Sequence, residues 1–509
     1  MMRPIIVMQY TAQYADLLAA LARKFSEKGY GSVLLHVGAS FLPPDKTSTF
    51  SAKAFDVVID LEECLRPRPT DQLGTSADVA ARAAAAEAAT GIRLLEAIRA
   101  DRHLGYGFVV GAQYARSRYS NAVTYDQSVD IATRVAAAIK KTLVENAVVA
   151  AIGYPASIEG NILLDSASAM RIAVRTPFLT AGGHFTWAAD KYYRPIALEQ
   201  RYLSALGMQT QMPTSVKTPS MARSARATLF IDSFRERTTL KYLLSRFYRL
   251  CRREVGNRIK RRGRVYGGYL LGEALLQTFR IWRLSRAALT QKPVLETLES
   301  DLPYVFAPLS VEPESTLMAE SPSCDNQLAF LDQLAKSLPG GWRLIVKEHP
   351  GATAPRPHQF WRQLAAYPNV IVAPMLESGE SYMPKAKAVA IIRSTMGMQA
   401  AVAGVPVITP HPAYYGAVLP HVFTAPSYQD IEAALKKIAA NDLPPLETRV
   451  AAAKALLSVL EAGVAVTDAS LLKGVGDGKP ISEDFVNAIV GGFFASLVGE
   501  PAPTQSVPT

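Results

Sequence analysis

The chain has 509 residues, of which 49% are hydrophobic and 19% charged; this composition predicts a globular protein of several domains and excludes a disordered one. Its three cysteines, Cys64, Cys251 and Cys324, form no CxxC pair, which argues against a disulfide framework and a zinc site. The net charge of +11 is concentrated, because residues 217–292 hold 19 Lys and Arg against 4 Asp and Glu.

The chain contains no N-terminal signal pattern and no run of about 18 apolar residues. The isolated cysteines also fit a reducing compartment. We therefore expect a cytoplasmic protein without a membrane span.

The first part of the chain, residues 1–212, alternates short apolar segments with helical stripes. We predict strands at 4–9, 32–37, 55–61, 107–111 and 147–153, and helices at 15–28, 75–101, 129–146 and 162–174. Strands that alternate with helices predict a parallel, doubly wound sheet and hence an α/β fold.

Residues 213–298 interrupt this pattern and carry most of the positive charge. Two helices rich in Arg and Leu are predicted at 230–253 and 269–289. On the first, one apolar face is flanked by basic residues; that face consists of Leu240, Leu243, Leu244, Phe247 and Leu250. This spacing predicts a basic amphipathic hairpin.

A second Rossmann-like domain is predicted at residues 299–445, where strand, loop and helix follow one another three times. The strands are expected at 304–309, 342–347 and 388–392. C-terminal helices at 446–500 and a disordered tail at 501–509 complete the domain organisation. Ligands of such sheets bind at the carboxyl ends of the strands, so the polar residues at these ends are the candidate site.

The second strand of this domain ends in a basic and stiffened turn. Lys347 and His349, two residues apart, are expected on the same face if the strand persists that far. Pro350 stiffens the turn and removes a backbone donor. We expect the His349 imidazole to donate a hydrogen bond to a phosphate.

The third strand is followed by Ser394 and Thr395, which open a helix. Two hydroxyl groups at a helix N-terminus are ordinary caps, but the same position attracts anions. Gly397 would let a ligand approach closely, and together with His349 this end predicts a phosphate cradle. Glu314, just past the first strand, is predicted to contact a sugar hydroxyl or a base.

Several cofactor motifs are missing from the sequence. No GxGxxG follows the first strand, no P-loop is present, and no HExxH or His/Cys cluster occurs. The chain also lacks the GxSxG elbow of hydrolases. We therefore predict no cofactor and no metal site.

Four motifs in this order resemble the capsule polysaccharide biosynthesis family, which includes the Kdo transferases of the capsule linker. They are Tyr304-Val-Phe-Ala-Pro-Leu-Ser-Val-Glu-Pro-Glu-Ser-Thr-Leu, Val346-Lys-Glu-His-Pro, Pro368-Asn-Val and Ser394-Thr-Met-Gly-Met-Gln-Ala-Ala-Val-Ala-Gly-Val-Pro-Val. The resemblance covers about residues 300–420, and the N-terminal half only in layout. It implies a GT-B glycosyltransferase, with two Rossmann-like domains facing a cleft.

The resemblance also implies roles for individual residues. In this family the His-Pro and Ser/Thr motifs bind the nucleotide and phosphate of a CMP-sugar, and they correspond to His349-Pro350 and Ser394-Thr395. An acidic residue of the N-terminal domain, often followed by Gly, serves as catalytic base. Glu159-Gly160 matches that pattern, with Asp165 as the alternative. Where many relatives carry Glu, this chain has Gln399, which lacks the charge and puts a role for a carboxylate there in doubt.

The resulting hypothesis is transfer of a sugar, for example from CMP-Kdo, to a saccharide or lipid-linked acceptor. In it His349 stabilises the leaving phosphate and Glu159 acts on the acceptor hydroxyl. Residues 217–292 are expected to hold the enzyme at the anionic inner face of the cytoplasmic membrane, and no nucleic acid is expected as partner. Two alternatives stay open, a CDP-glycerol-type polyol-phosphate transferase and a non-catalytic scaffold for polysaccharide assembly or export.

Overall fold

The structure is a computed structural model. It describes residues 3–11, 14–37, 52–101, 104, 123–179, 184–196, 198–207, 234–259, 271–289, 294, 298, 301–312, 315–319, 321, 324, 326–349, 356, 358–461, 464–465 and 481–498. The predicted strand at 107–111 and the predicted disordered tail at 501–509 lie outside these residues.

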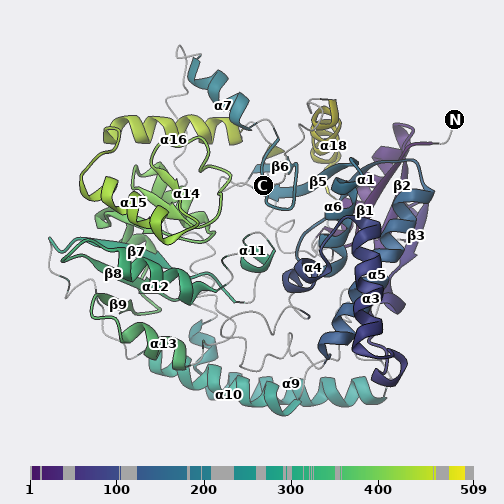
Figure 1. The fold of residues 1–509 in the computed structure, drawn as a ribbon, viewed down its shortest axis with the longest axis horizontal. Helices are drawn as coiled ribbons and strands as arrows, with labels where there is room; N and C mark the ends of the chain where they lie inside the picture. Colours follow the sequence, from purple (N-terminus) through teal and green to yellow (C-terminus); the bar gives the residue numbers. More distant parts are fainter. Residues whose placement is uncertain are drawn as a thin grey trace. The chain divides into compact units, whose positions relative to one another are not determined.

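The chain forms two compact units, each built around its own sheet (Figure 1). Unit 1 consists of residues 1–100, 123–201 and 459–509, and unit 2 of residues 101–122 and 202–458. Both units combine a mostly or wholly parallel sheet with helices, which confirms the predicted α/β fold class.

The sheet of unit 1 has seven strands in the order β13-β6-β5-β4-β1-β2-β3. The five strands from β5 to β3 are parallel, whereas β6 and β13 run antiparallel to their neighbours. The bounds are β1 Ile5–Gln9, β2 Gly31–His36, β3 Val57–Asp60, β4 Val148–Ile152, β5 Ala173–Leu179, β6 His184–Ala188 and β13 Val464–Ala465. Burial of β1 and β2 on both faces explains why they read as apolar runs.

The helices of unit 1 differ from the prediction in several places: the helix at 62–65 was not predicted, and the one predicted at 129–146 begins at residue 125. The predicted helix at 75–101 is two helices, because Gly91 ends the first with a left-handed φ of 72°. The predicted helix at 162–174 begins earlier and ends at residue 169, so that residue 159 lies in its first turn. The helices are α1 Ala15–Glu27, α2 Glu62–Leu65, α3 Ser76–Thr90, α4 Leu94–Ala100, α5 Tyr125–Glu145, α6 Ile158–Ala169 and α18 Glu483–Val498.

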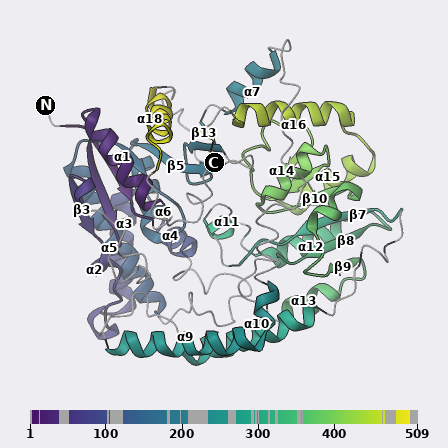
Figure 2. The same cartoon turned by 180° about the vertical axis from the view of Figure 1, so that it is seen from behind.

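Helix α18 completes the core of unit 1 although it comes from the far end of the described chain. It packs against α1 and β6 (Figure 2), with 5.0 Å between the ring centroids of Phe25 and Phe493. The buried Arg175 of β5 donates to the Ser496 hydroxyl at 2.7 Å and to its carbonyl at 2.8 Å. The first unit therefore closes only when this helix is in place.

The sheet of unit 2 has six parallel strands in the order β12-β11-β10-β7-β8-β9. The sequence did not predict β9 or β12, which have four and three residues. The strands are β7 Tyr304–Pro308, β8 Arg343–Lys347, β9 Val370–Ala373, β10 Ala388–Ala390, β11 Val407–Thr409 and β12 Val422–Thr424. Helices α12 and α15 pack against each other over a core centred on β7 and β8.

Helices surround this second sheet and also form the basic segment. Their bounds are α9 Leu240–Ile259, α10 Leu271–Ala288, α11 Ser315–Met318, α12 Gln327–Ser337, α13 His358–Ala365, α14 Thr395–Val402, α15 Tyr428–Ala439 and α16 Leu446–Glu461; α7, Leu198–Gly207, crosses the boundary between the units. Helix α9 packs against α10, and it extends further along the chain than the predicted end at residue 253. No described helix is both long and apolar enough to span a bilayer.

Candidate functional site

The predicted site residues of unit 2 follow β8 and β10, the two strands that flank β7. Because strands in a sheet are about 4.8 Å apart, the axes of β8 and β10 are separated by roughly 10 Å. His349 and Ser394 thus follow strands that lie on opposite sides of β7, and the loop after β7 lies between them. A ligand that touches both would need the length of a nucleotide rather than of a single phosphate.

A buried ionic network joins the loop after β7 to the loop after β8. The Arg356 guanidinium lies 2.8 Å from a Glu312 carboxylate oxygen and 2.7 Å from one of Glu348. All three side chains are almost fully buried, and Arg356 also donates to the Ser310 carbonyl at 2.6 Å. Burial raises the pKa of Glu312, an effect that Arg356 opposes. The network fixes both loops at the carboxyl edge of the sheet.

His349 is held at this edge through its backbone. Its N–H donates to the Glu348 carboxylate at 2.9 Å, so the ionic network sets the position of the imidazole. The residue is half-buried, and burial lowers the pKa of His349 below its ordinary value. The lowered pKa favours the neutral ring, which carries one N–H donor and one acceptor nitrogen.

Lys347 lies deeper than predicted. Its ammonium donates to the carbonyls of Glu348 at 3.2 Å and Met375 at 3.0 Å, and the side chain is buried. Burial lowers the pKa of Lys347 to about 8. In this structure Lys347 ties two loops together, whereas the sequence suggested direct contact with a phosphate.

Ser394 caps α14, and its hydroxyl accepts from the Met396 N–H at 3.2 Å. Both Ser394 and Thr395 are exposed, so their hydroxyl groups are accessible to a ligand. The backbone N–H groups of the first helical turn add positive partial charge at the same place. Arg393 directly precedes Ser394, and its carbonyl accepts a hydrogen bond from the Ser310 hydroxyl at 3.3 Å. This bond connects the start of α14 to the loop after β7.

Gly397 has a packing reason in this structure, and its contact with a ligand stays a prediction. A Cβ atom at this position would lie 2.1 Å from the Tyr415 hydroxyl and 2.2 Å from Ile391 Cδ1. The space beside the glycine is therefore filled by the protein itself. The predicted contacts of Glu314 and Pro350 lie outside the residues that the structure describes.

Glu159, the predicted base, lies at the carboxyl edge of the other sheet, where β1 and β4 are neighbours. It is buried in the first turn of α6, and one of its oxygens accepts hydrogen bonds from the Gln9 amide at 3.0 Å and from the Ser157 hydroxyl. Gly160 is required beside it, because a Cβ atom there would lie 2.0 Å from the Tyr154 carbonyl. The Glu-Gly pair therefore has a packing reason in this structure.

Asp165, the alternative base, lies in an ion-paired cluster. Its carboxylate is 2.8 Å from the ammonium of Lys191, which also contacts Glu96 at 2.6 Å. Hydrogen bonds and ion pairing raise the pKa of Lys191 against the opposing effect of burial. Lys191 thus stays charged and holds Asp165 in an ion pair, whereas Glu159 accepts from neutral donors.

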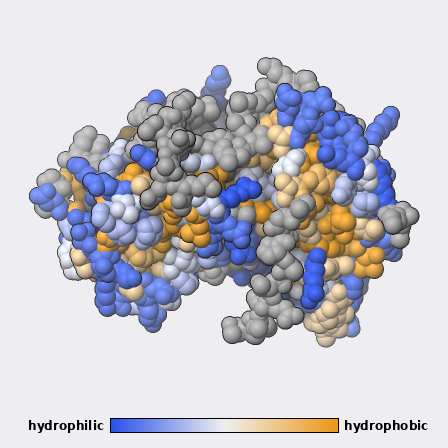
Figure 3. All heavy atoms as spheres, turned by 90° about the horizontal axis from the view of Figure 1, so that it is seen from above, coloured by the Kyte–Doolittle hydropathy of each residue, from blue (hydrophilic) through white to orange (hydrophobic). Residues whose placement is uncertain are grey.

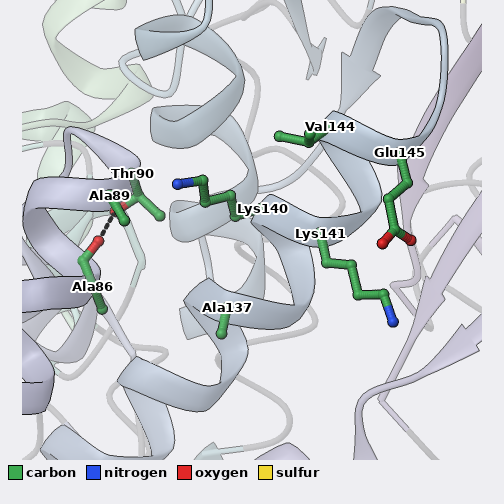
Figure 4. Close-up of a pocket in the computed structure, with 8 residues that line it drawn as sticks. All are labelled: Ala86, Ala89, Thr90, Ala137, Lys140, Lys141, Val144 and Glu145. Carbon is green, nitrogen blue, oxygen red and sulfur yellow. Dashed lines mark hydrogen bonds between the residues drawn. The ribbon is translucent and has the colours of Figure 1, made fainter.

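A surface pocket of about 310 Å³ lies between α3 and α5 (Figure 4). Short side chains such as Ala86 and Ala137 line it together with longer ones such as Lys140, whose ammonium is directed toward Thr90 in Figure 4. None of the predicted site residues lines it, so it is not the candidate site. Within the described ranges, no cluster of three or more His, Cys, Asp or Glu side chains is arranged to hold a metal ion.

Sequence reasoning missed the residues that order the two sheet edges, Gln9 in unit 1 and Arg356 in unit 2. Gln9 is the last residue of the strand predicted at 4–9, and a polar residue at the carboxyl end of a strand could have been recognised as a candidate site residue. Arg356 lies in a loop eight residues after Glu348 and has no motif around it. Its partners are known only once the chain has folded.

The sequence of unit 2 matches a known family over part of its length. Residues 277–418 match the model of the capsule polysaccharide biosynthesis protein family. This range contains β7, β8 and β10 and the polar residues that follow them. No curated protein sequence matches the chain significantly.

Solved structures give only distant likenesses. The β-Kdo 2,7-transferase KpsC of Thermosulfurimonas dismutans is 13% identical with a TM-score of 0.28, over 59% of this chain and 80% of that one. The UDP-GlcNAc 2-epimerase of Neisseria meningitidis bound to UDP-GlcNAc is 10% identical with a TM-score of 0.24, over 90% and 100% of the two chains. TM-scores this low establish nothing further about this chain. The family match confirms the resemblance seen in the four motifs: residues 277–418 carry the sequence signature of the capsule polysaccharide biosynthesis protein family.

Proposed function

We propose that the protein is a glycosyltransferase that moves a sugar from a nucleotide sugar, in particular a CMP-sugar, to a saccharide or lipid-linked acceptor. The observation that carries the proposal is the carboxyl edge of the second sheet. There a half-buried imidazole, two exposed hydroxyl groups and a helix N-terminus follow strands on either side of β7, within the segment that carries the family signature.

In the proposed reaction the bond between the anomeric carbon and the leaving phosphate oxygen breaks as the acceptor oxygen bonds to that carbon. Negative charge grows on the leaving nucleotide phosphate, where His349 and the first turn of α14 stabilise it. Glu159 takes the proton of the acceptor hydroxyl. The buried Lys347 contributes a fixed positive charge near the same edge.

The proposal is tested by thermal-shift measurements on the whole protein with CMP, CDP, UDP and GDP. A ligand that binds the folded state at 100 times its Kd adds about 2.7 kcal/mol of stability, so a clear rise in Tm is expected with CMP and a smaller one with the other nucleotides. A rise with CDP above CMP favours a polyol-phosphate transferase. No shift with any of the four overturns the donor assignment and favours the scaffold.

We further propose that the hairpin of α9 and α10 holds the enzyme on an anionic membrane, at the cytoplasmic face. The predicted single apolar face of α9 is divided: Leu243 and Leu250 are buried, whereas Leu240 and Leu244 are exposed. Exposed apolar residues are common, and some are visible among hydrophilic ones in Figure 3. On α9, however, they are aligned in a single stripe.

This α9 stripe consists of Leu240, Leu244, Tyr248, Cys251 and Val255. At 100° per residue these positions fall within an arc of about 80°. The exposed Lys241 and Arg252 lie along one side of that arc. Apolar side chains in a row beside cations are typical of helices that lie in the surface of anionic bilayers.

The double substitution Leu244→Glu and Tyr248→Glu is expected to lower binding to phosphatidylcholine vesicles containing phosphatidylglycerol by at least about tenfold, because each apolar side chain loses insertion and each new charge is repelled. Vesicle co-sedimentation measures this. Leu203→Glu on α7 is a matched control, since Leu203 and Leu244 are both 59% exposed. Equal binding by the double variant and the control would contradict the proposal.

A further inference from the structure

Gln9 has a position at the carboxyl edge of the first sheet that no motif predicts. It is the last residue of β1 and is buried, with 3% of its surface exposed. Its amide nitrogen donates to the Ser157 hydroxyl at 2.9 Å and to the Glu159 carboxylate at 3.0 Å. β1 pairs with β4, and α6 contacts both strands; β1 and α6 are labelled in Figure 1.

The orientation of this amide is fixed by the backbone. The side-chain amide oxygen of Gln9 accepts a hydrogen bond from the backbone N–H of Tyr154 at 2.7 Å. Because a backbone N–H cannot accept a hydrogen bond, the amide oxygen must face Tyr154 and the NH₂ group must face Glu159. The Tyr154 N–H thus selects one of the two possible orientations of the amide.

Two donors consequently converge on one carboxylate oxygen. The Ser157 hydroxyl accepts a hydrogen bond from the Gln9 amide and donates one to the Glu159 carboxylate, so the three side chains form a closed ring of hydrogen bonds. Hydrogen bonds donated to a carboxyl group stabilise its ionised form relative to its protonated form. Holding one oxygen also fixes the rotamer of Glu159, as a general base requires.

We propose that Gln9 is a positioning residue, which together with Ser157 holds the Glu159 carboxylate ionised and oriented toward the acceptor hydroxyl. This inference rests on the proposed function, in which Glu159 takes the acceptor proton. Gln9 itself touches no reacting atom. It supplies a fixed hydrogen-bond donor to Glu159, which is buried and would otherwise have one donor fewer.

The test is Gln9→Glu, which is nearly isosteric and keeps the acceptor for Tyr154 while it removes the donor to Glu159. Two carboxylates then share one buried place and retain a proton. We expect the ascending limb of the pH–rate profile for kcat to move to higher pH by at least one unit, while KM for the nucleotide sugar stays unchanged. Ser157→Ala, which removes the second donor, should move the limb in the same direction by less.

Gln127→Glu is the matched control. Gln127 lies in the capping box of α5 in the same unit, where glutamate is equally suited, and the substitution adds the same charge away from Glu159. In the part of this edge that the structure describes, other titratable groups include Tyr10, Tyr14, Tyr154, and His36 and Asp60 at the ends of β2 and β3, together with Asp165, Lys191 and Glu96. All of them are the same in every variant.

A second readout separates this inference from the proposed function. In protein labelled with ¹³C at the glutamate carboxyl carbons, the Glu159 signal is assigned from its loss in Glu159→Gln. Its titration should move to higher pH in Gln9→Glu even if no transfer is detected with any donor. Unchanged titration and an unchanged pH–rate profile in a folded Gln9→Glu protein would overturn the role of Gln9, whatever the activity of the wild type.

Discussion

His349→Ala is expected to lower kcat for sugar transfer by about 10²–10³-fold, the loss typical when one preorganised donor to a developing negative charge is removed. In the proposed reaction the imidazole donates one N–H to the leaving phosphate, and alanine donates none. Because that charge is larger in the transition state than in the bound nucleotide sugar, kcat should fall while KM for the nucleotide sugar changes little, as initial-rate kinetics would measure.

His349→Gln provides the comparison, since the amide keeps an N–H donor and should restore part of the lost rate. Both variants leave the backbone bond from residue 349 to Glu348 intact, so the melting temperature should stay near that of the wild type. Wild-type rates from a folded His349→Ala protein would remove this residue from the mechanism.

Arg356→Met is expected to lower the free energy of unfolding by about 3–5 kcal/mol, the cost of leaving buried charges without their partner. The substitution strands the carboxylates of Glu312 and Glu348, which are both buried against the guanidinium. Chemical denaturation of the whole chain measures the loss. Arg343→Met is the control, because Arg343 contacts only backbone carbonyls near the surface and should change stability by less than about 0.5 kcal/mol.

The stability loss in Arg356→Met should depend on pH in a definite direction. A stranded buried carboxylate holds its proton to higher pH in the folded state than in the unfolded one, where a glutamate has a pKa of about 4.3. The folded variant then binds more protons above that pH, so its stability falls as pH rises. The triple variant Arg356→Met, Glu312→Gln, Glu348→Gln should recover much of the loss. If the free energy of unfolding recovered neither at low pH nor in the triple variant, Arg356 would stabilise the protein by packing and not by charge.

Local patterns in the sequence predicted the α/β class and the strand ends that carry polar residues. Apolar runs bounded by turns mark β7, β8 and β10, and Ser394 is recognisable as a helix cap. The order of the strands is a different matter, since no local pattern states that β7 lies between β8 and β10. For that reason the sequence could not give the separation of His349 from Ser394.

Burial of polar side chains is also decided by tertiary structure. Lys347 and His349 are two residues apart and were expected to face the same ligand, yet the ammonium of Lys347 is directed to the Met375 carbonyl. Gly397 looked like an opening for a ligand because a glycine near a phosphate site often is one, and only the neighbouring Tyr415 shows that the space is filled. Each of these contacts joins segments whose proximity the sequence does not encode locally.

The packing of α18 on α1 and β6 bears on the order in which the chain can fold. Ribosomes release a chain from its N-terminus, and domains generally fold as they emerge. Yet Phe25 and Trp187 pack against Phe493, which lies more than 300 residues further along the chain. During that interval residues 301–461, which include every strand of the second sheet, have already left the ribosome. The half of the protein that is made first is therefore the half that finishes last, and its unfilled core needs protection until α18 arrives.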